Sequence, residues 1–208
     1  MRRLPPKALL YALLNKLNRW SGTGNRRFEF ERLYLESTDP WNFLGSPYEH
    51  RKYAHTLTRI LEWRAGSQQA LEVGCSIGIF SKRLAEQFGT VTAIDFSEVA
   101  LRRAADYCRD NRNISFLRSN LRALNVNRVF DVIVCAEILY YIAEDQAAIV
   151  CRQLQRYLGR TGIIVVVSEM AEGGDFWEKA LSDRFKKVQK ESVPDDDRSF
   201  QIVIFQNP

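Results

Sequence analysis

The sequence predicts an α/β fold built on a mostly parallel sheet. From residue 69 onward, short apolar segments alternate with longer amphipathic ones, which is the pattern of repeated strand–helix units. Two of the short segments, Phe130–Cys135 and Ile163–Val167, show no alternation of polar and apolar residues, as expected of central parallel strands buried on both faces. The segment Gln69–Val73 runs into a tight turn between Gly74 and Gly78, and a helical segment comes after it. These observations together predict helices on both faces of one sheet.

Seven strands are expected in all. Five of them alternate with helices, and the last two form a closing antiparallel pair around Pro194 and an acidic turn. Helices are expected from the glycine turn to Phe88, after the capping residue Ser97, from about Asp145 to Leu158, and from Gly173 to Phe185. The expected strands are Gln69–Val73, Thr90–Asp95, Ile114–Leu117, Phe130–Cys135, Ile163–Val167, Val188–Val193 and Ser199–Phe205.

A basic N-terminal extension, residues 1–36, is expected to precede a domain spanning residues 37–208. Residues 1–35 carry eight basic and two acidic side chains, a net charge of 8 − 2 = +6. The remaining residues carry 22 basic and 23 acidic side chains, a net charge of −1. Because the basic character is confined to the extension, the domain lacks the signature of a nucleic-acid groove, and no nucleic-acid partner is expected.

The segment Ala8–Trp20 predicts an amphipathic helix whose apolar residues fall within roughly 140° of arc. It is too short to span a membrane and lacks the small-residue cleavage site of a signal peptide. Two interpretations stay open. In the first, the apolar stripe packs on the domain or on a second subunit. In the second, the basic helix rests on an anionic membrane surface. We therefore expect a cytoplasmic protein, with peripheral contact at the inner membrane face as the alternative.

The cysteine and histidine content predicts neither disulfides nor a metal site. The four cysteines form no CxxC pair, which is typical of a reduced cytoplasmic protein. The two histidines, His50 and His55, are five residues apart and belong to no HExxH or Cys/His cluster. His50 falls in a helix that Ser46 and Pro47 are expected to start, because Ser46–Glu49 forms a capping box with proline at the first helical position.

The glycine turn admits three interpretations, of which two fit poorly. A dinucleotide fold would need glycine at position 76 and a small residue at position 79, where the chain has Ser76 and Ile79. The turn also matches the G-x-S-x-G pattern of a serine hydrolase. That fold needs a histidine after the nucleophile, whereas both histidines precede Ser76.

The third interpretation is a methyltransferase that uses S-adenosylmethionine. The residues Glu72, Gly74, Ser76 and Gly78 fit the acid-x-Gly-x-small-x-Gly pattern of that class, in which Cys75 is a small residue that fits the turn. Asp95 ends the second strand, where a carboxylate can accept from both hydroxyls of a ribose. The further cofactor-binding candidates are Phe96 against the adenine, Asn120 and Leu121 after the third strand, and Glu137 after the fourth. Asn120 stands where the class often has an aspartate that faces the adenine amino group, and the asparagine can still accept from that amine, although without charge.

From Ser37 to Pro208 the chain resembles the nodulation protein S family of N-methyltransferases, which act on amino-sugar oligomers. The segments that carry the resemblance are Asp39–Trp41, Pro47–Arg51, Leu71–Cys75, Ile94–Asp95 and Phe130–Tyr141. The resemblance implies a Rossmann-like seven-stranded methyltransferase sheet and a small-molecule acceptor, such as a free amine on a saccharide. The basic segment at residues 8–20 lies outside the resemblance and would suit a lipid-linked or membrane-associated acceptor better.

The expected reaction is an in-line displacement at a sulfonium, in which proximity and orientation do much of the work. An amine acceptor must arrive neutral, so a base or a polar path for its proton is useful. The candidates are His50, Glu137, Tyr140 and Tyr141. The alternatives are an exposed helix position for His50 and core packing for one of the two tyrosines.

Two more residues are candidates for cofactor contact. Related methyltransferases have an arginine in the helix before the first strand that reaches the cofactor carboxylate, and Arg51 is the matching residue. Trp41 is expected either to cover the cofactor or to anchor the N-terminal segment on the core. The leading hypothesis is thus an active small-molecule methyltransferase, with N-methylation favoured. The alternative is a methyltransferase-like fold without chemistry that acts as a membrane-tethered binding partner.

Overall fold

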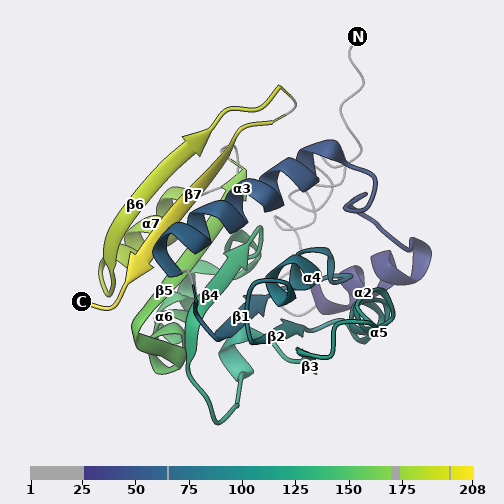
Figure 1. Ribbon diagram of the computed structural model, residues 1–208, viewed down its shortest axis with the longest axis horizontal. Coiled ribbons are helices and arrows are strands. Elements are labelled where there is room, and N and C mark those ends of the chain that lie inside the picture. Colours follow the sequence, from purple (N-terminus) through teal and green to yellow (C-terminus); the bar gives the residue numbers. More distant parts are fainter. Residues whose placement is uncertain (1–25, 65, 170–173, 197) are drawn as a thin grey trace.

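The computed structural model describes residues 26–64, 66–169, 174–196 and 198–208 of the chain. They form one seven-stranded sheet in the order β3-β2-β1-β4-β5-β7-β6, with helices on both faces (Figure 1). All neighbouring strands from β3 to β5 are parallel, and β7 is antiparallel to both β5 and β6. This is the Rossmann-like, mostly parallel seven-stranded sheet expected from the sequence. The strands are β1 Gln69–Val73, β2 Thr90–Asp95, β3 Ile114–Arg118, β4 Phe130–Ala136, β5 Leu158–Glu169, β6 Lys186–Val193 and β7 Phe200–Gln206.

The sheet is apolar on both sides, and each side has its own helices. On β4, Val132 and Val134 face one hydrophobic cluster, while Ile133 and Cys135 face the other. The first cluster contains side chains of α2 to α5, and the second contains side chains of α6 and α7. Because the central strands are covered on both faces, their sequences need no polar alternation. The helices are α2 Arg26–Glu36, α3 Pro47–Arg64, α4 Ile79–Ala85, α5 Glu98–Tyr107, α6 Ala147–Tyr157 and α7 Gly174–Ser182.

The start of β5 differs from the prediction. The strand begins at Leu158, five residues before the expected Ile163, and directly follows α6. Leu158 pairs with Phe130, and the register shifts before Val132 pairs with Ile163. The intervening Arg160 and Thr161 are exposed, so the paired segment carries no apolar signal in the sequence.

Helix α3 begins where the capping box predicts. The backbone N–H of Glu49 donates to the Ser46 hydroxyl at 3.3 Å. The carboxylate of Glu49 is fully buried and lies 3.1 Å from the Lys52 ammonium, one turn further along the helix. In Figure 1, α3 crosses one face of the sheet, and its first turn lies towards the end at which the parallel strands finish. That position brings the first turn of α3 to the edge where α/β folds bind ligands.

Helix α2 packs on the body of the domain although the sequence places it in the extension. Phe30 and Tyr34, one turn apart, are buried in the hydrophobic cluster on the α3 side of the sheet. Arg103 of α5 donates to the carbonyl oxygens of Ser37 and Thr38, just after α2. The apolar face of α2 is therefore part of the domain core, even though the helix precedes the expected boundary at residue 36. The expected helix at residues 8–20 lies outside the described residues, and none of the described helices is long and apolar enough to cross a membrane.

Candidate functional site

The site is built around the turn that joins β1 to α4. Gly74 and Gly78 adopt the left-handed region with φ of +78° and +83°. A Cβ on Gly74 would lie 2.8 Å from Cδ1 of Ile138, closer than real Cβ atoms approach. The N–H groups of Gly74 and Cys75 both donate to the carbonyl oxygen of Ile94. The turn is thus tied to β2 at the carboxyl end of β1, the edge of the sheet at which α/β folds bind ligands.

Asp95, at the end of β2, fixes this turn from the side. Its carboxylate accepts from the backbone N–H of Ser76 at 3.0 Å and from that of Ser97 at 2.9 Å. Ser76 itself has a left-handed φ of +50°, which the hydrogen bond to Asp95 helps to hold. Burial raises the pKa of Asp95 to about 6, although the backbone donors oppose this shift.

Two cavities adjoin at this edge of the sheet. The larger has a volume of about 340 Å³ and is lined by Gly74, Asp95, Phe96, Asn120, Leu121 and Tyr141, among others. The smaller has a volume of about 80 Å³ and is lined by Tyr34, Trp41, Ser76 and Glu137 together with Gly74 and Asp95. The larger volume lies in the range of pockets that hold small ligands, about 300–1,000 Å³.

Aromatic side chains cover both cavities. Phe30 of α2 makes edge-to-face contacts with Phe96 at 5.6 Å and with Tyr141 at 5.1 Å between ring centroids. Trp41 is buried, and its ring centroid lies 5.1 Å from that of Tyr34. Phe30, Phe96 and Tyr141 line both cavities, whereas Tyr34 and Trp41 line only the smaller one.

Tyr34 links α2 directly to the glycine turn. Its hydroxyl donates to the Ser76 hydroxyl at 2.6 Å. Burial raises the pKa of Tyr34 well above its usual value, so the phenol stays a hydrogen-bond donor at all physiological pH values.

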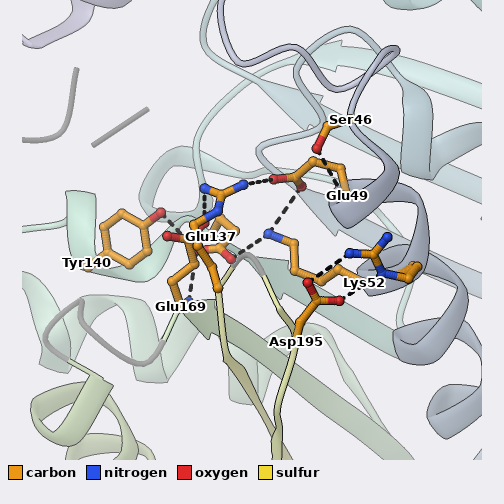
Figure 2. Close-up of polar contacts among 9 residues, drawn as sticks. Ser46, Glu49, Lys52, Glu137, Tyr140, Glu169 and Asp195 are labelled. Atoms are coloured by element: carbon orange, nitrogen blue, oxygen red, sulfur yellow. Dashed lines mark hydrogen bonds and ion pairs between the residues drawn. The ribbon is translucent and has the colours of Figure 1, made fainter. Parts of the chain in front are cut away.

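Glu137 is the centre of an ionic network at the ends of β4 and β5 (Figure 2). Its Oε1 lies 2.7 Å from Nζ of Lys52, and its Oε2 accepts from the Tyr140 hydroxyl at 3.0 Å. Burial alone would lower the pKa of Lys52, but the carboxylates of Glu137 and Glu49 outweigh it and raise this pKa. The ammonium is therefore charged, and it is shared between two carboxylates from different parts of the chain.

Eight of the residues predicted for the site line one or both cavities. The amide oxygen of Asn120, expected to face the adenine amino group, accepts instead from the backbone N–H groups of Arg122 and Ala123. If this oxygen also accepted from the adenine amino group, it would have to do so in addition to capping the next turn. The eight residues are Trp41, Gly74, Asp95, Phe96, Asn120, Leu121, Glu137 and Tyr141.

Three other predicted residues stabilise the turn on the side that does not line the cavities. Glu72 is buried and accepts from the Ser81 hydroxyl, which ties β1 to the first turns of α4. Cys75 is buried against the α5 side of β2, and Gly78 lies where a Cβ would meet Ala104 at 3.0 Å. None of these three residues lines either of the two cavities, so they shape the site without facing it.

His50 and Arg51 lie away from the cavities. The ring of His50 is within hydrogen-bond distance of the Leu44 carbonyl oxygen at 2.9 Å and of Arg83 at 2.8 Å. Arg51 forms a bidentate ion pair with Asp195 in the β6–β7 loop. Tyr140 also lines neither cavity and contacts the site through Glu137.

Four residues that were not predicted to bind the cofactor or to act in catalysis belong to this constellation: Phe30, Tyr34, Ser76 and Lys52. The spacing of Phe30 and Tyr34 at i and i+4 on a short helix was available in the sequence as a signal. Lys52 gave no such signal, because a lysine on a helix is usually exposed. Among the described residues, no three His, Cys, Asp or Glu side chains are grouped to hold a metal ion.

Several known proteins of similar sequence share one name. Nodulation protein S from Sinorhizobium fredii (strain NGR234) is 31% identical over 140 residues, which cover 67% of this chain and 59% of the relative. Nodulation protein S from Rhizobium tropici is 34% identical over 110 residues, which cover 53% of this chain and 46% of the relative. The chain thus spans about half the length of these curated relatives.

The fold is shared with a solved structure, that of the N-methyltransferase NodS from Bradyrhizobium japonicum WM9 in complex with S-adenosyl-L-homocysteine. The TM-score is 0.79 at 24% identity, and the match covers 88% of this chain and 98% of that one. The family description Nodulation protein S (NodS) matches residues 24–178, a stretch that includes α2 and every cavity-lining residue named above. The chain belongs to the Nodulation protein S family.

Proposed function

We propose that the protein is an S-adenosylmethionine-dependent methyltransferase that acts on a small molecule. The main observation behind the proposal is that Gly74 and Asp95 both line the two cavities, which lie at the carboxyl ends of the parallel strands. A left-handed glycine without room for a Cβ and a buried carboxylate are what an adenosine-containing ligand requires there. Membership of the Nodulation protein S family and the shared fold support the same assignment.

The residues present fit the cofactor. In the larger cavity, Asp95 would accept from the ribose hydroxyls, and Phe96 and Leu121 would pack on the adenine. In the smaller cavity, the open backbone at Gly74 and the hydroxyl of Ser76 would face the methionyl end. The side chain of Asn120 would hold the loop that closes the adenine end, because its oxygen already caps that loop.

When bound, the cofactor supplies a methyl group on a positively charged sulfur, which is a good leaving group. The protein then has to orient the acceptor in line and exclude water. Phe30, Trp41 and Tyr141 would exclude water, since their rings line the smaller cavity. The ring faces of Trp41 and Tyr141 would also stabilise the positive charge of the sulfonium and the charge that develops on the amine.

We assign Glu137 an electrostatic role in this reaction. Both of its carboxylate oxygens already accept from donors, Oε1 from Lys52 and Oε2 from Tyr140. A carboxylate held in this way is better suited to stabilising the positive charge that develops on the nitrogen of a neutral amine as it accepts the methyl group than to removing a proton, which the methylated product would lose to solvent. We propose no direct role for His50, because its ring contacts Leu44 and Arg83 and lies outside both cavities.

The acceptor we favour is an amine on a saccharide or on a lipid-linked saccharide, which makes N-methylation the favoured reaction. The carboxylate of Glu137 in the cavity wall and the family membership support an amine. The basic amphipathic sequence at residues 8–20 supports a lipid-linked acceptor and a peripheral contact with the membrane surface.

The proposal is tested by calorimetric titration with S-adenosylhomocysteine, with NAD as the control. We expect binding of S-adenosylhomocysteine alone, at micromolar concentrations, and at least about tenfold weaker binding by the D95A variant, because a hydrogen-bonded charge is lost. An acceptor screen with isotope-labelled methyl donor then compares amino sugars and lipid-linked saccharides with their N-acetylated forms. Absence of S-adenosylhomocysteine binding would refute the proposed function, and methylation of the N-acetylated forms alone would refute the amine acceptor.

A further inference from the structure

We propose that Lys52 is a positioning residue: its buried ammonium holds Glu137 in a left-handed turn, and that turn sets the wall of the smaller cavity. The inference rests on the proposed function, because this cavity is the one assigned to the methionyl end and the acceptor.

Lys52 is buried, so its charge cannot contribute to solubility as the charge of an exposed lysine does. The side chain is 1% exposed, and a buried charge is costly unless it is paired. Nζ lies 3.1 Å from Glu49 Oε2 and 2.7 Å from Glu137 Oε1. Glu49 is the local partner, one turn away on α3. Glu137 is 85 positions further along the chain, so its ion pair with Lys52 is a tertiary constraint between α3 and the end of β4.

The backbone of Glu137 needs such a constraint. Its φ is +55°, in the left-handed region that residues other than glycine adopt rarely. Its N–H donates to the Val167 carbonyl oxygen at 2.8 Å, which continues the pairing of β4 with β5. Its carboxylate accepts from Tyr140, from the backbone N–H of Glu169 at 3.3 Å and from Lys52. Lys52 is the charged donor of the three, and such hydrogen bonds are roughly twice as strong as neutral ones.

The turn at Glu137 sets the direction of the chain beyond β4. Ile138, the next residue, packs so close to the glycine turn that a Cβ on Gly74 would meet its side chain at 2.8 Å. Ile138 and Tyr141 both line the two cavities. A change of backbone conformation at Glu137 would therefore displace Ile138 from Gly74 and alter the space at the methionyl end. Figure 2 shows the Lys52 ammonium reaching from α3 to the Glu137 carboxylate.

The alternative is that Lys52 only neutralises Glu49 within α3 and contributes stability alone. The two possibilities predict different effects of removing Lys52 from a protein in which residue 137 is glycine, because the backbone of glycine does not need to be held in the left-handed region. Glycine adopts the left-handed region without cost. In the E137G background, a positioning role for Lys52 is lost, whereas its pairing with Glu49 remains.

A double-mutant cycle of K52M and E137G tests the inference, with affinity for S-adenosylhomocysteine measured by calorimetry. We expect K52M to lower this affinity by about tenfold in the protein that retains Glu137, and by less than about threefold in the E137G background. K190M is the matched control, since Lys190 is a half-exposed lysine that is also paired with a glutamate, Glu178. We expect K190M to have no effect on the affinity in either background.

A second ligand, 5′-methylthioadenosine, separates positioning from general loosening. It lacks the amino-acid end, so K52M should change its affinity by less than about threefold. If K52M does not fold, as judged by circular dichroism, the cycle is measured in the E49Q background, where one buried carboxylate fewer has to be neutralised without Lys52. Equal losses in both backgrounds, or equal losses for both ligands, would overturn the inference. If the wild type fails to bind S-adenosylhomocysteine, the proposed function is refuted, and this inference falls with it.

Discussion

Replacing Glu72 by glutamine should stabilise the folded protein at neutral and alkaline pH and leave it little changed in acid. Glu72 lies on the central strand β1 behind the glycine turn and is 5% exposed. Its carboxyl group accepts from the Ser81 hydroxyl, a contact that glutamine can also make. Burial raises the pKa of Glu72 to about 8, the Ser81 hydroxyl opposes this shift, and the nearby charge of Asp95 adds to it.

The sign and size of the effect come from proton linkage. Between about pH 4.5 and about pH 8, the folded state keeps a proton on Glu72 that the unfolded state has lost. The free energy of unfolding therefore falls as the pH rises through this window, by about 1.4 kcal/mol per pH unit. Over the whole window the wild type loses up to roughly 5 kcal/mol from this group, and the E72Q variant loses none of it.

Urea unfolding of the wild type and E72Q at about pH 5 and about pH 8.5 measures the effect. We expect the stability advantage of E72Q over the wild type to be larger at the higher pH by at least about 2 kcal/mol. This value is less than half of the roughly 5 kcal/mol that proton linkage allows. E86Q is the matched control, because Glu86 is an exposed carboxylate at the end of α4, and removing it should add no such pH dependence. A difference between wild type and E72Q that stays constant with pH would show that Glu72 is ionised in the fold and would refute the reasoning.

Three further predictions concern the glycine turn and its supports. G74A should weaken S-adenosylhomocysteine binding by at least about tenfold, because its Cβ would meet a neighbouring side chain at 2.8 Å; G66A, with a similar φ but open space around it, should leave binding unchanged. The affinity of the wild type for this ligand should fall as the pH drops through about 6, where Asp95 takes up a proton. D95N should bind weakly without that pH dependence, and a D95N profile identical to wild type would exclude Asp95 as the cause. Y34F should lower the melting temperature by an amount equivalent to about 1 kcal/mol, since it removes the donor to the Ser76 hydroxyl; an unchanged melting temperature would mean that this hydrogen bond does not hold α2 in solution.

The arrangement of the strands was predictable because burial on both faces leaves a strong pattern in the sequence. β1 and β2 begin and end at the predicted residues, and β4 is one residue longer than expected. The pattern failed at Leu158–Gly162, where β5 extends into a polar segment. There the pairing of Leu158 with Phe130 is set by the neighbouring strand, and local composition does not reveal it.

The residues of the cavity were predictable where they come after strands of the parallel sheet. Gly74, Asp95, Asn120 and Glu137 each lie at or just after the end of a strand, and strand ends converge on one edge regardless of the details of packing. The side chains contributed by helices were not predictable in the same way. A helix can present any of its faces to the edge, so the residue that reaches the site depends on the rotation of the helix about its axis.

Arg51 and Lys52 show how much that rotation decides. Neighbouring residues on a helix point about 100° apart, so only one of the two can face the ends of β4 and β5. The structure turns Lys52 inward to 1% exposure and leaves Arg51 half exposed against Asp195. The inward position needs a cation that can be surrounded by two carboxylates in a small space, which suits a compact ammonium. The outward position holds an acid in a two-point ion pair, which suits a planar guanidinium. The order of the two basic residues on α3 therefore matches the chemistry of the places that they occupy, and exchanging them as R51K/K52R should disrupt both ion pairs although the charge of the helix is unchanged.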